Sequence, residues 1–145
     1  MANPRVTIGI IGCNRLHYFR ALMESAHRCI QYDNLEWIVF DNASIEEGMS
    51  EYLDTLTYVD HLIRRKERSP STEHVTAMNE ILDMATGEFL ILMPDDMQFI
   101  LEGNWLQDLV ELAVDDLGVG SIVLNAQRHT SIQRFFRSDR GLTRL

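Results

Sequence analysis

Apolar and amphipathic segments alternate along the first 126 residues of the chain. Five apolar runs, rich in β-branched residues, have the pattern of buried parallel strands and lie at residues 5–12, 35–40, 59–65, 88–93 and 119–126. Apolar side chains recur at helical spacing in the four segments between them, at residues 15–31, 44–56, 71–87 and 103–116. This alternation predicts an α/β fold in which flanking helices cover a mostly parallel sheet.

Two of the predicted helices carry terminal signals. Ser44 stands where an N-cap is expected, and Glu47 three residues later completes the spacing of a capping box. The third helix is predicted to begin after Ser71 or Thr72 and to end at Gly87. Because no repeat or internal linker interrupts the alternation, we predict one domain over residues 1–127.

The length and composition are typical of a globular domain. The chain has 145 residues, of which 46% are hydrophobic and 24% are charged. We see no membrane segment, because no apolar run approaches the length of a membrane helix. We see no signal peptide, because no basic segment and cleavage site flank a long apolar stretch. Cys13 and Cys29, the only cysteines, form no CxxC motif, so neither a disulfide framework nor a zinc site is indicated. We expect a reducing, cytoplasmic location.

The net charge of −9 is unevenly distributed along the chain. Residues 1–127 hold 8 basic and 21 acidic residues, whereas residues 128–145 hold five arginines and one aspartate. An acidic body argues against non-specific nucleic-acid binding, which needs a contiguous basic surface. The basic tail at residues 128–145 has two interpretations: a solvated end, or a segment that grips a phosphate or an acidic partner.

Polar groups follow three of the predicted strands, in "GCNR" (residues 12–15), "DNAS" (41–44) and "PDD" (94–96). Ligands of open parallel sheets bind beyond the carboxyl ends of the strands, so these loops are the expected site. Asp95 and Asp96 are adjacent carboxylates, which repel each other unless a cation or donors hold them. A hard divalent cation, Mg²⁺ or Mn²⁺, fits such a pair when water and substrate phosphates complete its coordination.

Structural roles for these loops stay open at this point. Asp95 and Asp96 could form a solvated turn or a helix N-cap, and residues 41–44 could form only an Asx turn. The familiar nucleotide and hydrolase motifs are absent from the sequence, since it holds no GxGxxG, GxxxxGK[ST], GxSxG or HExxH.

Three stretches together resemble a known family. "VTIGIIGCNRLHYFRALMES", "LEWIVFDNASIEEG" and "AMNEILDMATGEFLILMPDD" are similar, in order and spacing, to the nucleotide-binding half of inverting family 2 glycosyltransferases. The resemblance covers nearly residues 5–125 and implies the GT-A fold, a Rossmann-like sheet that binds a nucleotide-diphospho-sugar. It also implies that residues 128–145 begin a missing or truncated acceptor half.

The resemblance implies roles for individual residues. It assigns metal binding to Asp96 with help from Asp95. It assigns nucleotide binding to Cys13, Asn14, Arg15, Asp41, Asn42, Asn79 and Asp95. Cys13 stands where the family usually has tyrosine, Met78 where arginine precedes Asn79, and Pro94 where an acidic residue is frequent.

We therefore expect a glycosyltransferase domain that binds its donor through Mg²⁺ or Mn²⁺ and serves an acceptor that the sequence does not identify. The family's general base lies in a second half, so no residue of this chain is assigned that role, and we expect weak or no transfer by this chain alone. A homo-oligomer is compatible with the sequence. The alternatives are a truncated, non-catalytic nucleotide-binding module and another Mg²⁺-dependent nucleotidyl or phosphate enzyme.

Overall fold

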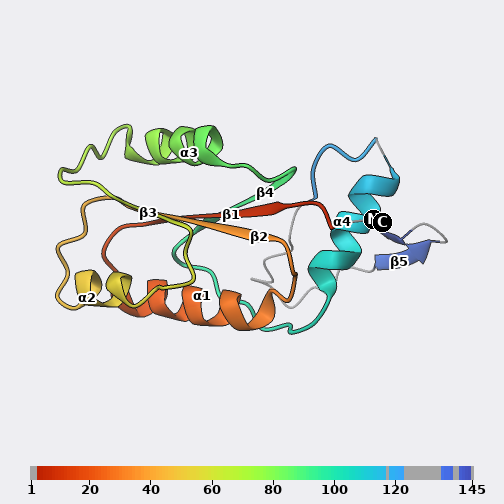
Figure 1. Cartoon of the computed structure of the whole chain (residues 1–145), viewed down its shortest axis with the longest axis horizontal. Coiled ribbons are helices and arrows are strands. Elements are labelled where there is room, and N and C mark those ends of the chain that lie inside the picture. Colours follow the sequence, from red (N-terminus) through yellow and green to blue (C-terminus); the bar gives the residue numbers. More distant parts are fainter. Residues whose placement is uncertain (1–2, 117, 123–134, 139–140, 145) are drawn as a thin grey trace.

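The computed structural model describes residues 3–116, 118–122, 135–138 and 141–144. Its main sheet is all parallel, in the order β3-β2-β1-β4 (Figure 1). The strands are β1 Val6–Gly12, β2 Leu35–Asp41, β3 His61–Arg64 and β4 Phe89–Pro94. The predicted α/β fold with a parallel sheet is confirmed, and β1 lies between β2 and β4.

Helices cover both faces of this sheet. Helices α1 (Leu16–Cys29) and α2 (Met49–Asp54) lie on one face, and α3 (Glu73–Met84) lies on the other (Figure 1). The larger core packs alternate residues of β1 and β2 against α1 and α2, and includes Ile8, Ile10, Val39, Phe19, Leu22, Met49 and Leu53. The smaller core joins Ile11, Ile38 and Phe40 to Ala77 and Ile81 of α3. β1 and β2 are therefore buried on both faces, as their continuous apolar runs predict, whereas the outer strands β3 and β4 are only partly buried.

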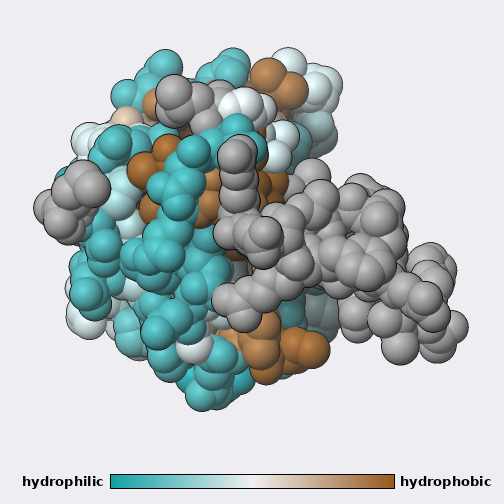
Figure 2. Space-filling view, turned by 90° about the vertical axis from the view of Figure 1, so that its right-hand side faces the viewer, coloured by the Kyte–Doolittle hydropathy of each residue, from teal (hydrophilic) through white to brown (hydrophobic). Residues whose placement is uncertain are grey.

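Helix α4 (Trp105–Asp115) lies beyond the amino ends of the strands in Figure 1 and adds Leu106 and Val110 to the larger core. Seen from that side, apolar side chains gather between hydrophilic ones (Figure 2). Side chains of β4, α4 and residues 119–122 line a cavity of about 630 Å³ there. None of the helices in the described ranges is long and apolar enough to cross a bilayer.

The predicted fifth strand over residues 119–126 is not part of the sheet as far as the structure describes it. Residues 119–122 form no strand, and residues 123–126 lie outside the described residues. In the basic tail, β5 (Phe135–Ser138) and β6 (Gly141–Arg144) form an antiparallel pair. The other tail residues lie outside the described part, so the division at residue 127 stays a prediction.

The second predicted helix is shorter than the sequence pattern suggests. α2 begins at Met49, after Gly48 with a φ of 79°, rather than after Ser44. The predicted N-cap role of Ser44 is wrong because its hydroxyl has other partners. It donates to Asp41 Oδ1 and accepts a hydrogen bond of 2.6 Å from the backbone N–H of Asn14.

A buried carboxylate ties β2 to the loop that follows α3. Glu36, which is 1% exposed, accepts hydrogen bonds from the hydroxyl of Thr7 (2.5 Å) and from the backbone N–H and hydroxyl of Thr86 (both 2.8 Å). Burial alone would raise the pKa of Glu36, but these hydrogen bonds and the charge of Arg5 together lower it. The group is therefore ionised and fully bonded at neutral pH.

Gly87 is required next to this carboxylate. Its backbone N–H donates to Thr7 Oγ1 (3.0 Å), and a Cβ at this position would lie 2.6 Å from the backbone nitrogen of Thr7. Any side chain would therefore force β1 and the loop after α3 apart. The sequence pattern had placed this glycine only at the end of a helix.

We predict that Glu36→Gln lowers the free energy of unfolding by about 1–3 kcal/mol at pH 7, because an amide nitrogen would face donors of Thr7 or Thr86. Since the folded pKa is lowered, the stabilisation is present above the pKa of an unfolded glutamate, about 4.3. It is lost as the pH falls through the folded value. Denaturant titrations between pH 7 and pH 3 measure the difference. The exposed Glu88→Gln is the control, and equal stability of Glu36→Gln and wild type at pH 7 would contradict the assignment.

Candidate functional site at the carboxyl ends of the strands

The loops that follow β1, β2 and β4 meet at one edge of the sheet. Gly12 of β1 is paired with Asp41 of β2, and Ile11 is paired with Pro94 of β4. The backbone N–H of Asn42 donates to the carbonyl of Gly12 at 2.9 Å. We call this edge the rim; it lies toward the α2 end of the sheet in Figure 1.

Backbone strain is concentrated at the rim. In the described ranges, the non-glycine residues with positive φ are Asn14 (55°), Arg15 (53°) and Ala43 (52°). Each such residue costs on the order of 1 kcal/mol and persists only where its surroundings hold it. Such residues tend to cluster at functional sites, so the rim is the first place to look for one.

Asn14 holds the two strained loops together. Its side-chain oxygen accepts hydrogen bonds from the backbone N–H groups of Ile45 (2.8 Å) and Glu46 (3.1 Å). In return, Glu46 Oε2 accepts from the backbone N–H of Leu16 at the start of α1 (3.1 Å). The side-chain oxygen of this predicted nucleotide-binding residue is thus already occupied by protein donors.

Asp41 and Asn42 are both buried at the end of β2. Asp41 uses both carboxylate oxygens on Ser44, one on its hydroxyl and one on its backbone N–H (3.3 Å). This backbone bond reaches three residues on, not the two residues of an Asx turn. The carbonyl of Asn42 accepts from the thiol of Cys13 at 3.1 Å. Burial raises the pKa of Cys13 and outweighs the nearby charge of Arg68, so the thiol is protonated and can donate.

Asp95 and Asp96 form a turn after β4, and no helix begins there, so the N-cap interpretation is wrong. Asp95 is 2% exposed and accepts from the backbone N–H of Cys13 at 3.3 Å. The guanidinium of Arg15 forms an ion pair with Asp95 and lies 3.9 Å from Asp96 Oδ2. Burial, with the charge of Asp96, raises the pKa of Asp95, and the donors from Cys13 and Arg15 offset this only in part.

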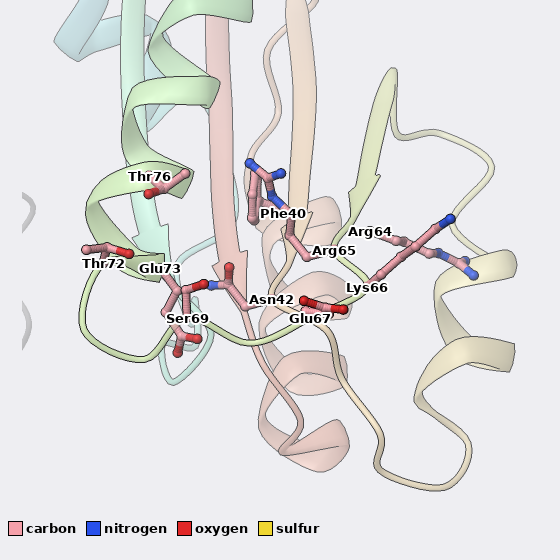
Figure 3. Close-up of a pocket in the computed structure, with 10 residues that line it drawn as sticks. All are labelled: Phe40, Asn42, Arg64, Arg65, Lys66, Glu67, Ser69, Thr72, Glu73 and Thr76. Carbon is pink, nitrogen blue, oxygen red and sulfur yellow. The ribbon is translucent and has the colours of Figure 1, made fainter.

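A cavity of about 550 Å³ opens beside the rim, between the carboxyl ends of β2 and β3 and the start of α3 (Figure 3). Its lining residues are Phe40, Asn42, Arg64, Arg65, Lys66, Glu67, Ser69, Thr72, Glu73 and Thr76. Of the residues that the sequence singled out, Asn42 lines this cavity. A volume of this size is typical of small-molecule sites.

The cavity carries most of the positive charge near the rim. Arg65 lies over the ring of Phe40, at 5.4 Å from its centre, and forms an ion pair with Glu80. Arg68, in the loop that borders the cavity, makes two hydrogen bonds of 2.5 and 2.7 Å to Glu73. Sequence analysis missed these residues, although "RRK" at the end of the third strand is the densest basic run of an acidic body.

The structure brings most of the predicted site residues together, but not all. Cys13, Asn14, Arg15, Asp41, Asn42, Asp95 and Asp96 share the rim. Asn79 is exposed on α3 and does not line the cavity, which α3 reaches with Thr72, Glu73 and Thr76.

We predict that Arg15→Gln destabilises the fold more than Asp95→Asn does. The side chain of Arg15 is 50% exposed, so water can solvate it when Asp95 is neutralised. Asp95 has no such access, and leaving it without its partner costs about 1–3 kcal/mol. Urea unfolding of the two variants at pH 7 makes the comparison, and a larger loss for Asp95→Asn would show that the pair stabilises the arginine instead.

Comparison with known proteins agrees with this geometry. The family model for glycosyl transferase family 2 matches residues 7–140. A Sinorhizobium fredii (strain NBRC 101917 / NGR234) protein, "Uncharacterized protein y4gI", is 29% identical over 119 residues, which is 82% of this chain and 13% of that protein.

Two solved structures share the fold. A mannosyltransferase from Pyrobaculum calidifontis, in complex with GDP-Man and Mn²⁺, superposes with a TM-score of 0.60 at 23% identity, over 78% of this chain and 33% of that one. S. aureus TarS gives 0.63 at 17% identity, over 77% and 20%. The chain thus spans a third or less of the length of these proteins. With the family model matching most of its residues, the chain belongs to glycosyl transferase family 2.

Proposed function

We propose that this chain binds the nucleotide-diphospho-sugar donor of a glycosyltransferase at the rim and the adjacent cavity, with a divalent cation. The observation that carries the proposal is the juxtaposition of two carboxylates, Asp95 and Asp96, with a cavity of nucleotide size lined by arginine and lysine. A cation at the carboxylates and basic groups at the cavity are the two kinds of charge that a diphosphate requires.

The cavity fits the nucleoside end of such a donor. The Arg65 guanidinium, which lies over the buried ring of Phe40, offers a flat surface for a base. The carboxylate of Glu67 and the hydroxyls of Ser69 and Thr76 offer hydrogen-bonding groups for a base and ribose. Asn42 lies between the cavity and the rim, where a nucleoside and its phosphates would meet.

The donor set at the rim fits Mg²⁺ or Mn²⁺. Asp96 is the more accessible ligand, with a side chain that is 41% exposed, and Asp95 lies next to it. The described residues hold no group of three or more potential metal ligands, so phosphate and water oxygens would complete the coordination. When bound, the cation would stabilise the diphosphate that leaves as the sugar is transferred. A mannosyltransferase of the same fold, in complex with GDP-Man and Mn²⁺, supports this proposal.

The residues of this chain would bind and orient the donor. Asn14 and the strained turns around it would hold Asp95, Asp96 and Asn42 in fixed positions, which limits the reorganisation that binding requires. We assign none of the described residues as the base that takes the proton of an acceptor hydroxyl. We therefore propose sugar transfer only as the reaction of the family, whereas we propose named residues for the donor site.

The first prediction for this function concerns the metal. Asp96→Asn is expected to weaken Mn²⁺-dependent binding of a nucleoside diphosphate by about 10- to 100-fold, because one charged ligand is lost. Calorimetry with GDP and UDP, each with Mn²⁺ and with EDTA, measures the effect. Asp83→Asn, an exposed aspartate on α3, is the control. Unchanged affinity in Asp96→Asn would leave Asp95 and Asp96 as a structural turn.

The second prediction concerns the cavity. Thr76→Phe is expected to abolish nucleoside-diphosphate binding, since the new ring would fill space between α3 and Arg65 (Figure 3). Val75→Phe is the matched control, because Val75 is exposed on the same helix and does not line the cavity. Thermal-shift titrations follow both variants, since a bound ligand raises Tm. Full binding by Thr76→Phe would place the nucleoside elsewhere on the rim.

A further inference from the structure

Arg15 lies where a cation is needed. Its guanidinium pairs with the buried Asp95 and lies 3.9 Å from Asp96. Two adjacent carboxylates, one of them almost completely buried, are unfavourable without a positive charge beside them. In this structure the guanidinium of Arg15 supplies that positive charge.

The backbone directs Arg15 toward the carboxylates. Arg15 is the N-cap residue of α1, with φ 53° and ψ 48°, in the left-handed region. Asn14 before it has the same conformation and is fixed by its bonds to Ile45 and Glu46. A left-handed pair of non-glycine residues has a free-energy cost, so the position of Arg15 is imposed by its surroundings and is not a default of the helix start.

The side chain can nevertheless leave Asp95. It is half exposed, unlike Asp95, and its guanidinium lies 5.9 Å from the ring centre of Tyr18 on the solvent side of α1. A cation–π interaction with Tyr18 would stabilise the guanidinium in a position away from Asp95. Moving Arg15 requires no unfolding of the core, since none of its side-chain partners is a hydrophobic residue of the core clusters.

A divalent cation and the Arg15 guanidinium compete for the same oxygens. Both would need Asp95, and their like charges repel at such short distances. A diphosphate changes the balance, because its oxygens accept both the cation and a guanidinium, for which arginine is well suited.

We propose that Arg15 is an internal counter-ion of Asp95 and Asp96 that the divalent cation displaces and the donor diphosphate then receives. The site consequently disfavours free cation and favours cation bound together with nucleotide. This inference rests on the proposed function, because it assumes that the cation and the diphosphate bind at the rim. Arg15 in this role is a binding residue, because its guanidinium contacts the diphosphate directly once the cation has displaced it from Asp95.

The experiment compares the affinities for Mn²⁺ alone and for GDP or UDP with Mn²⁺. Arg15→Gln is expected to bind free Mn²⁺ at least about fivefold more tightly than the wild type. The factor by which Mn²⁺ and nucleotide strengthen each other's binding is expected to fall by a similar amount. Because coupling is reciprocal, titration of either ligand measures it. Arg15→Lys keeps the charge but not the planar fork and is expected to lie between wild type and Arg15→Gln. It also serves if Arg15→Gln folds poorly.

Arg20→Gln is the matched control. It removes the same charge five residues further along the chain, on α1, where Arg20 lies over the ring of Tyr52 at 4.9 Å. An equal gain in Mn²⁺ affinity in Arg20→Gln would reduce the effect to net charge and overturn the counter-ion role. So would unchanged or weaker Mn²⁺ binding by Arg15→Gln when the wild type binds Mn²⁺ and nucleotide. If neither protein binds Mn²⁺ or nucleotide, both the inference and the proposed function fail.

Discussion

β1 is hydrogen-bonded along both edges, in parallel and without a break in register, to β2 and to β4. In a parallel ladder the register determines where neighbouring strands end relative to one another. The three loops that form the rim therefore leave the sheet at one level, and cross-links such as the one from Cys13 N to Asp95 can form between them. The strain at Asn14, Arg15 and Ala43 can be maintained only because the strands before these residues are fixed.

The pKa of a buried carboxylate is shifted in opposite directions at the two ends of the sheet. At the amino end, Glu36 has donors enough to lower its pKa in spite of burial. At the carboxyl end, the pKa of Asp95 is raised, because burial and the neighbouring Asp96 outweigh its donors. A carboxylate that the fold leaves incompletely stabilised, on a strained rim beside a cavity, is typical of a functional site. Glu36, whose donors Thr7 and Thr86 lie on two segments far apart in the sequence, is typical of structural support.

Local sequence patterns predicted what depends on local physics. The β-branched runs predicted β1 to β4, most directly the central β1 and β2, because strands buried on both faces need continuous apolar side chains. Local patterns failed where residues distant in the sequence determine the structure. Ser44 has the residue type of an N-cap, but its hydroxyl is hydrogen-bonded to Asp41 and to the backbone N–H of Asn14. The assignment of Asn79 to the nucleotide by resemblance stays a prediction; Thr76, one turn earlier on α3, lines the cavity. That cavity was missed because its walls come from β2, the loop after β3 and α3, which no single stretch of sequence contains.

The bonds around Glu36 also constrain how the sequence of this chain can change. Thr7, Glu36, Thr86 and Gly87 satisfy one another, so altering one of them leaves a buried donor, a buried charge or a steric overlap behind. Replacing several of them together by apolar residues of matching shape would leave fewer such groups, and the combined loss would be smaller than the sum of the single losses. These four positions, 80 residues apart at their extremes, therefore form one mutational unit. In homologous chains we expect them to vary jointly or not at all.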